Sequence, residues 1–376
     1  MKKVFSIIIA VLIVAGGLVI FLSGQGVFSG IPNSVEPYNE SGFFYSRLNP
    51  SEKKAFDLIM REIYEFPEKI AVNPLTQTEL DNVFEAVLYD TTDLFFLEES
   101  CSMKTEGTKT YFLPSYLNTR EEYLKKKEEL DKQVNAIVTR AMEIEDEYER
   151  ELFIHNAVIE GCSYINKSGG DASGAYGCLV QGKSSCAGYA RAMKMIFDKC
   201  SVENHFALGE TGNSQGGTDG HIWNIIKING SFYHVDATWD DNDVLKESKY
   251  TYLNVDDKEI QLTHSVEKRF LGECTDRKDN YFVRNGLYLT EYNEKAGNVI
   301  SQKLAEFADN SQSQLAVKFA DEGLYKKALT ELFEKEGVYR LLVRANMLCK
   351  KELITDKVRY LCDDTHHILR IVEYYK

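Results

Sequence analysis

The pattern of apolar and polar positions begins with a long uncharged stretch. Residues 4–22, 19 in all, carry no charge and follow Lys2 and Lys3. At about 1.5 Å per residue, a helix of this length approaches the roughly 30 Å hydrocarbon core of a bilayer. The pattern therefore predicts a transmembrane signal-anchor helix. The positive-inside rule then places residues 1–3 in the cytoplasm and the bulk of the chain outside it.

Other interpretations of this stretch lead to different proteins. A cleaved signal peptide has an apolar region of about 7–15 residues and an A-x-A-like site. Residues 21–26, at the end of the apolar stretch, match that cleavage site poorly. Cleavage there would leave a secreted protein. A lipoprotein anchor is excluded because no Cys follows the stretch. A buried helix of a soluble protein is disfavoured by its position behind two lysines. We therefore expect a single-pass cell-membrane protein with an extracytoplasmic bulk.

Beyond a linker rich in Ser, Gly, Asn and Pro at 23–50, apolar residues recur at helical spacing. Ser51 is expected to cap a helix whose apolar positions run through 56–64. Two more helices are predicted by capping boxes, in which a threonine is followed three residues later by a glutamate. These pairs are Thr76 with Glu79 and Thr119 with Glu122.

The rest of the pattern alternates between helices, strands and loops, without an internal repeat. The predicted elements are short strands within 91–118, a charged helix to about Met142, an amphipathic helix around 148–159, a Gly- and Ser-rich loop at 161–182, an apolar helix at 186–200, strands within 203–262, helices near 298–308 and 323–335, and strands at 315–319 and 368–375.

Composition narrows the class of protein. Hydrophobic residues make up 44% and charged residues 27% of the chain, which is typical of a globular domain with a core. The 25 Gly and 6 Pro exclude a collagen-like chain. The net charge of −14 argues against a nucleic-acid partner, because nucleic acids are bound through Lys and Arg. The mean hydropathy of −0.32 shows that the apolar start is an exception.

The eight cysteines do not predict a metal site. None forms a C-x-x-C pattern, and no Cys/His pair has finger spacing, so structural zinc is not expected. Export would permit disulfides, whose pairing the sequence leaves open. No acidic loop resembles an EF-hand, and the acidic run at 240–243 is interpreted as a turn. We expect neither a metal nor a cofactor.

One cysteine stands where a nucleophile could be held. Cys186 begins the apolar helix at 186–200, and Ser184 or Ser185 can cap that helix. A helix N-terminus carries a partial positive charge that favours a thiolate. Helical spacing places Cys186 on the face of Ala190 and Met193. From this segment alone, an inert core cysteine is the favoured interpretation.

A predicted hairpin brings a histidine and an aspartate together. The β-rich runs 221–228 and 231–239 flank an Asn-Gly pair, the strongest short signal for a two-residue turn. The register then sets His221 and Asp236 on one face as diagonal neighbours, roughly 7–8 Å apart. A carboxylate on one ring nitrogen fixes the tautomer and leaves the other nitrogen for a thiol. The implied opposite pairs are His221 with Thr238 and Trp223 with Asp236.

The other histidines have simpler interpretations. His234 faces the same side of the hairpin and is expected to be a structural histidine packed beside the pair. His366 and His367 lack partners at metal-binding spacing and are expected at the surface.

Three segments together resemble the transglutaminase-like superfamily. They are G-K-S-S-C-A-G-Y-A around Cys186, G-H-I-W-N around His221 and Y-H-V-D-A-T-W-D around Asp236. The order Cys, His, Asp and the separations of 35 and 15 residues are similar to the family pattern, over about residues 146–245. The resemblance implies a papain-like α+β core, in which a Cys-bearing helix packs on an antiparallel sheet that carries the His and the Asp.

The resemblance also implies an activity. A Cys186–His221–Asp236 triad would transfer or hydrolyse acyl groups of protein or peptide amides through a thioester, with a cell-surface or cell-wall substrate suggested by the expected location. Gln181 is a candidate oxyanion donor, by analogy with the Gln that precedes the Cys in papain-like enzymes. Trp223 and Trp239 either wall the cleft or pack beneath the sheet. The alternative is a non-catalytic binding or scaffold protein that uses the same domain.

These inferences combine into one domain scheme. The predicted parts are a cytoplasmic N-terminus at 1–3, a signal anchor at 4–22, a linker at 23–50, a mainly helical region at 51–145, a transglutaminase-like core at 146–290 and a small α+β domain at 291–376.

Overall fold

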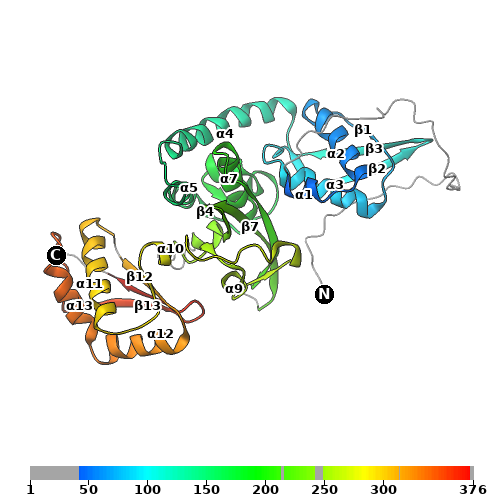
Figure 1. The fold of residues 1–376 in the computed structure, drawn as a ribbon. Helices are drawn as coiled ribbons and strands as arrows, with labels where there is room; N and C mark the ends of the chain where they lie inside the picture. Colours follow the sequence, from blue (N-terminus) through cyan, green and yellow to red (C-terminus); the bar gives the residue numbers. More distant parts are fainter. Residues whose placement is uncertain (1–41, 213–215, 242–248, 313, 373–376) are drawn as a thin grey trace. The chain divides into compact units, whose positions relative to one another are not determined.

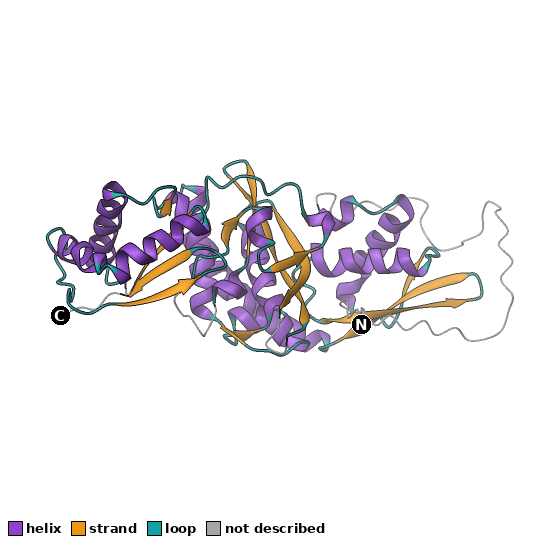
Figure 2. Cartoon of the chain, turned by 90° about the horizontal axis from the view of Figure 1, so that it is seen from below, coloured by secondary structure: helices purple, strands orange, loops and turns teal. Residues whose placement is uncertain are grey.

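The computed structural model describes residues 42–212, 216–241, 249–312 and 314–372. The chain is α+β with antiparallel sheets, and it divides into two compact units. Among the described residues, the first unit comprises those up to Ile228 together with 236–241 and 265–270, and the second comprises 229–235, 249–264 and those from 271 onward. Helices and strands occur together in both units (Figures 1 and 2). The finer domain scheme given above stays a prediction.

The expectation of a single-pass membrane protein is corrected. Among the residues that the structure describes, no helix is both long enough and apolar enough to cross a bilayer. The predicted signal anchor at 4–22 lies outside the described residues, as do the predicted cytoplasmic residues 1–3 and most of the linker. The cell-membrane location that was inferred from this stretch is therefore not supported.

The first unit opens with helices packed on a small sheet. Its order of strands is β1-β3-β2, and both pairings are antiparallel. The elements are α1 (Phe43–Ser46), α2 (Pro50–Glu62), β1 (Ile70–Val72), α3 (Gln77–Asp90), β2 (Leu97–Glu106), β3 (Lys109–Tyr116) and the long α4 (Arg120–Ala141).

Capping explains where these helices begin. The predicted capping boxes at Thr76 and Thr119 are confirmed. The hydroxyl of each threonine accepts from the backbone N–H of the glutamate three residues on, and the glutamate carboxylate accepts from the backbone N–H of the threonine. Ser51 is not a cap. The side chain of Asn49 instead accepts from the N–H groups of Ser51 and Glu52, and Pro50 occupies the first helical position, where its missing N–H costs nothing.

The rest of the first unit surrounds one buried helix. It adds α5 (Glu147–Gly161), β4 (Ser163–Tyr164), a 3-10 turn at Gly170–Ser173, α6 (Ala175–Leu179), β5 (Lys183–Ser184), α7 (Cys186–Lys199), β6 (Asn204–Gly212), β7 (Thr218–Ile228) and α8 (Ala237–Asp240). The segment 161–182, predicted as loop, thus contains a short strand and a helix. Nearly every residue of α7 is buried, including Met193 and Phe197, and each such side chain contributes about 1.5–3 kcal/mol by leaving water.

The central sheet has five strands in the order β10-β6-β7-β8-β9. Its further members are β8 (Ser231–Val235), β9 (Leu253–Val255) and β10 (His264–Val266). The predicted Asn-Gly hairpin is confirmed. Asn229 and Gly230 have φ angles of 48° and 80°, the pair of positive values that a type I′ turn requires.

The second unit ends in helices and a four-stranded sheet. Its sheet has the order β11-β12-β14-β13, with a parallel β11–β12 pair and antiparallel neighbours. The elements are α9 (Asp257–Ile260), α10 (Tyr281–Arg284), β11 (Tyr288–Leu289), α11 (Glu294–Asp309), β12 (Gln314–Phe319), α12 (Glu322–Leu329), α13 (Gly337–Asn346), β13 (Arg359–Asp363) and β14 (Ile368–Val372).

Candidate active site

Cys186 is the first residue of α7, and its side chain is partly exposed. Ser185 occupies the N-cap position but makes no side-chain cap bond, contrary to the expected serine cap. The hydroxyls of Ser184 and Ser185 instead donate to the carbonyl of Ala172, at 2.7 and 3.1 Å. The two serines therefore fix the start of α7 against the 3-10 turn at 170–173.

Gly188 of α7 allows the segments around Ser184 and Gly174 to pack closely against the start of the helix. A Cβ at Gly188 would lie 1.7 Å from Ser184 Oγ and 2.8 Å from the carbonyl oxygen of Gly174. No side chain fits that space, because real Cβ contacts essentially never fall under 3.0 Å. The glycine in the Cys186 motif thus sets the position of the helix that carries the thiol.

His221 lies on β7 opposite Gly209 of β6. The ring of Trp223 lies beside the imidazole, with centroids 5.7 Å apart and planes inclined at 20°. Trp239 meets His221 edge-on at 6.4 Å. Trp223 is fully buried, whereas Trp239 is half-buried. The two tryptophans therefore contact the ring of His221 from two directions.

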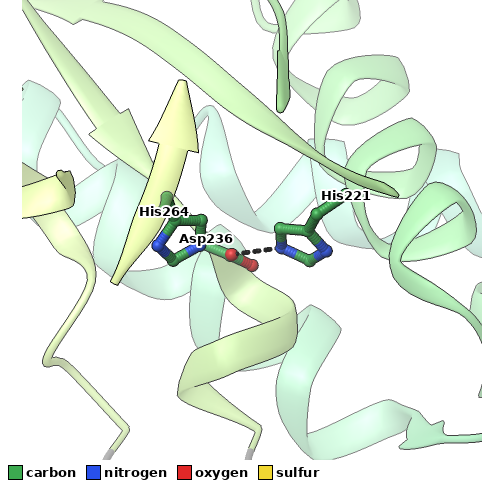
Figure 3. A group of neighbouring side chains, drawn as sticks. All are labelled: His221, Asp236 and His264. Atoms are coloured by element: carbon green, nitrogen blue, oxygen red, sulfur yellow. Dashed lines mark hydrogen bonds and ion pairs between the residues drawn. The ribbon is translucent and has the colours of Figure 1, made fainter. Parts of the chain in front are cut away.

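Asp236 contacts His221 directly, as Figure 3 shows. His221 Nε2 donates to Asp236 Oδ2 over 2.6 Å, and both side chains are at least 95% buried. The other oxygen, Oδ1, accepts from the backbone N–H groups of Thr238 and Trp239 at 2.9 and 3.1 Å. Both carboxylate oxygens are therefore held in place.

The predicted register is wrong beyond Val235. The strand β8 ends there, and Asp236 is the N-cap of α8 rather than a strand residue opposite Trp223. Thr238, expected opposite His221, lies in that helix. The carboxylate satisfies N–H groups at the start of a helix, and this local bond competes with continuation of the strand.

The surroundings of His221 favour its protonated form. Burial lowers the pKa of His221, because it penalises the charged imidazolium. The charge of Asp236 and its hydrogen bond act in the opposite sense, as do a hydrogen bond and charge from Cys186, and together they raise the pKa to about 10. Cys186 and Asp236 thus both act on one imidazole, and Nε2 faces the carboxylate.

Two further side chains hold α8 in place. His155 of α5 contacts Asp240 through Nε2 and Oδ2 at 3.0 Å, with both side chains fully buried. Tyr189 of α7 donates its hydroxyl to Asp241, directly after α8. The short helix that Asp236 caps is therefore tied to α5 and α7 at its far end. Of the acidic run at 240–243 that was predicted as a turn, Asp240 ends this helix and Asp241 is its C-cap, while residues 242–243 lie outside the described residues.

Gln181 lies between α6 and β5. Its side-chain amide donates to Asp171 Oδ2 at 3.0 Å, and the same carboxylate forms an ion pair with Lys126 at 2.6 Å. One hydrogen of the Gln181 amide is thus engaged by Asp171. Its role as an oxyanion donor stays a prediction.

Tyr164 is a neighbour of the thiol that the sequence did not single out. Its strand β4 pairs in parallel with β5, which places Tyr164 beside Ser184. Burial raises the pKa of Tyr164, and the charges of Cys186, Asp219 and Asp236 raise it further. The side chain is 40% exposed. No local signal marks it, because its segment looks like a loop in sequence.

Two other histidines and the cysteines also have defined surroundings. His234 is buried and its Nε2 contacts Asp257 Oδ1 at 2.9 Å. His366 is not a surface residue: it is buried, and its Nδ1 contacts Asp363 at 3.0 Å. All eight cysteines lie among the described residues, and none of them forms a disulfide.

No protein-family model matches the chain, and no curated protein matches it.

Some solved structures resemble part of the chain. A TGase aligns with 39% of this chain and 46% of its own, at 14% identity and a TM-score of 0.27. A candidate cysteine protease from Cytophaga hutchinsonii aligns with 37% of this chain and 61% of its own, at 14% identity and a TM-score of 0.25. A candidate protease from Parabacteroides distasonis aligns with 36% and 35%, at 9% identity and a TM-score of 0.21. The chain spans less than two thirds of each.

Proposed function

We propose that the protein is a transglutaminase-like cysteine enzyme that transfers or hydrolyses acyl groups of protein or peptide amides. The observation that carries this proposal is the 2.6 Å bond between His221 Nε2 and Asp236 Oδ2, combined with the interaction of the same imidazole with Cys186. A thiol, an imidazole and a buried carboxylate in sequence form the arrangement of a nucleophile, its base and the group that orients the base.

The first half of the proposed reaction forms a thioester. The sulfur of Cys186 attacks the amide carbon while His221 carries the proton of the thiol. The C–N bond then breaks, and the imidazolium gives that proton to the departing amine. Asp236 stays ionised and stabilises the imidazolium through Oδ2, while its Oδ1 is held by α8. The fixed carboxylate keeps the tautomer and the direction of the ring.

The second half of the reaction releases the acyl group. Water or an amine attacks the thioester carbon, His221 removes a proton from the attacking atom, and the C–S bond breaks as that proton returns to sulfur. Water yields a carboxylate and an amine yields a new amide. The triad residues are the same for both acceptors.

Two groups are proposed to stabilise the oxyanion. The backbone N–H of Cys186 lies at the start of α7, where N–H groups carry a partial positive charge. The side chain of Gln181 would be the second donor after a rotation away from Asp171, because one of its hydrogens is engaged there. Tyr164, exposed beside the thiol, is proposed to contact the substrate.

The test compares transfer with hydrolysis in one preparation. The purified chain is incubated with a glutamine-rich protein and a fluorescent primary amine, and both amine incorporation and peptide release are followed. We expect the wild type to show either amine incorporation or peptide release. The rate of that reaction should fall at least about 10²-fold in His221→Ala, the usual range for removal of a general base, and the reaction should be abolished in Cys186→Ala. His366→Ala is the matched control, since it removes another buried His–Asp pair.

If neither product forms, or if Cys186→Ala retains full activity, the enzymatic proposal is wrong. Binding of the protein without turnover would then favour the scaffold alternative.

A further inference from the structure

A second set of one cysteine, one histidine and one aspartate comes together within the second unit. A ring nitrogen of His234, a carboxylate oxygen of Asp257 and Sγ of Cys274 all lie within 4.8 Å of one another. His234 belongs to β8, α9 begins at Asp257, and Cys274 lies in the segment after β10. We propose that these three side chains bind a divalent metal ion of the zinc type.

The donor atoms match the chemistry of that ion. Zinc takes Cys sulfur at about 2.3 Å, and His nitrogen and carboxylate oxygen at about 2.0–2.2 Å, in tetrahedral geometry. Ligand atoms around such an ion are therefore roughly 3–4 Å apart. His234 Nε2 and Asp257 Oδ1 are 2.9 Å apart, so only a small movement of the three groups is needed to admit the ion between them.

The backbone fixes the three donors in relation to each other. The N–H of Gly272 donates to Asp257 Oδ2 at 2.8 Å, and the N–H of Asp257 donates to the carbonyl of Cys274 at 2.7 Å. The carboxylate is thus oriented by one end of the segment 272–274, while the thiol comes from its other end. Such outer contacts are what hold metal ligands in position.

Burial and charge both suit a cation at this position. Cys274 is fully buried, as is the side chain of His234, while that of Asp257 is 14% exposed. Burial raises the pKa of the Cys274 thiol, and the neighbouring carboxylates of Asp257, Glu273 and Asp256 raise it further. The same negative surroundings stabilise a divalent cation, which would in turn deprotonate the thiol.

The ion bonds to the Cys274 sulfur, the Asp257 oxygen and the His234 nitrogen, and the thiol proton passes to solvent. Since Asp257 reaches the surface, a water molecule completes the tetrahedron. The spacing rules for zinc motifs miss this set, because His234 and Cys274 are 40 residues apart and meet only through the fold.

The experiment measures metal on the full chain rather than activity. Cys186→Ala serves as the background, because it removes the thiol of the candidate active site. The chelator-treated protein is titrated with Zn²⁺ in equilibrium dialysis, and with Co²⁺ to record thiolate-to-cobalt charge-transfer absorption. We expect one Zn²⁺ per chain at micromolar free metal, and a charge-transfer band.

Variants assign the ligands. Cys274→Ser should abolish the cobalt band, and His234→Gln and Asp257→Asn should each weaken zinc binding at least tenfold. Two matched controls should bind zinc with the affinity of the Cys186→Ala protein. They are Cys101→Ser, which changes another buried thiol, and His366→Gln, which changes another His–Asp pair.

Absence of zinc binding, or an unchanged cobalt band in Cys274→Ser, would overturn the proposal. If Cys274→Ser fails to fold, as judged by circular dichroism, the near-isosteric Asp257→Asn decides. A variant that folds and retains the background affinity for zinc contradicts the site, and one that loses it supports the site.

Discussion

His221 and Asp236 are joined by a hydrogen bond of 2.6 Å, and the carboxylate that receives it also caps the helix α8. A single side chain thus orients the imidazole with one oxygen and fixes its own position with the other. The bond to α8 means that Asp236 cannot rotate without losing two N–H contacts. Because Asp236 contacts the imidazole directly, the protonation of His221 is the property that reports this contact most directly.

Replacing Asp236 should lower the pKa of His221. Asp236→Asn removes the carboxylate charge, which in the wild type acts together with the hydrogen bonds from Asp236 and Cys186 and the charge of Cys186 to outweigh burial, so that the pKa is about 10. In the variant, burial dominates and the imidazole loses its proton at lower pH. Measurement of the His221 ring resonance by NMR across pH checks this. The alkaline limb of the activity profile should move to lower pH with it, and an unchanged titration would contradict the assigned cause.

The same shift predicts how stability depends on pH. The folded-state pKa of His221 is raised from 6.5 to about 10, so the protonated form is favoured by folding. Its contribution to the free energy of unfolding is fully present below about pH 6.5 and is lost as the pH rises through about 10. Urea denaturation of the wild type and His221→Gln should therefore differ most near pH 6 and converge above pH 10. A constant difference across this range would argue against a raised pKa.

The contact between His155 and Asp240 should be needed for folding. Both side chains are fully buried, and removing one partner of such a pair costs about 3–5 kcal/mol, because a polar or charged group is left without compensation. His155→Ala should therefore lower the urea midpoint strongly. The exposed pair of Lys326 and Glu322 provides the control, and Lys326→Met should leave the midpoint unchanged. Equal midpoints for both variants would refute the anchoring of α8.

Gly188 should not tolerate a side chain. Gly188→Ala places a methyl group against Ser184 and the carbonyl of Gly174, and such overpacking typically costs about 1–3 kcal/mol. Because the strain falls at the junction that positions Cys186, activity should decrease more than stability. Gly161→Ala is the control, since a Cβ there meets nothing within 4 Å. Full activity in Gly188→Ala would show that the close approach does not matter.

Local signals in the sequence predicted local structure well. The helices after Thr76 and Thr119 begin where their capping boxes place them, because a cap is decided by neighbours three residues apart. The Asn-Gly turn is formed for the same reason. The cap of α2 is Asn49 and not the predicted Ser51, a difference of two residues. It arises because Pro50 already fits the first helical position.

Predictions that depended on tertiary contacts were weaker. The contact of His221 with Asp236 was expected from a continued strand, but it forms across the end of β8 and the start of α8. His155 meets Asp240 over 85 residues, and Tyr164 pairs with Ser184, two residues before Cys186, from a segment that looked like a loop. Helical periodicity and hairpin register carry no information on such pairs, because the packing of distant elements determines them.

The central claim is that His221 and Asp236 activate Cys186 as a nucleophile. The most direct measurement is competitive alkylation of the native chain with isotope-labelled iodoacetamide at pH 7, with mass spectrometry reporting the rate for each of the eight cysteines. In the wild type, Cys186 should react faster than the exposed Cys362. The rate of Cys186 should fall at least about tenfold in His221→Ala and to an intermediate value in Asp236→Asn. If Cys186 reacts no faster than Cys362, or if its rate is unaffected by His221→Ala, the proposed triad is wrong.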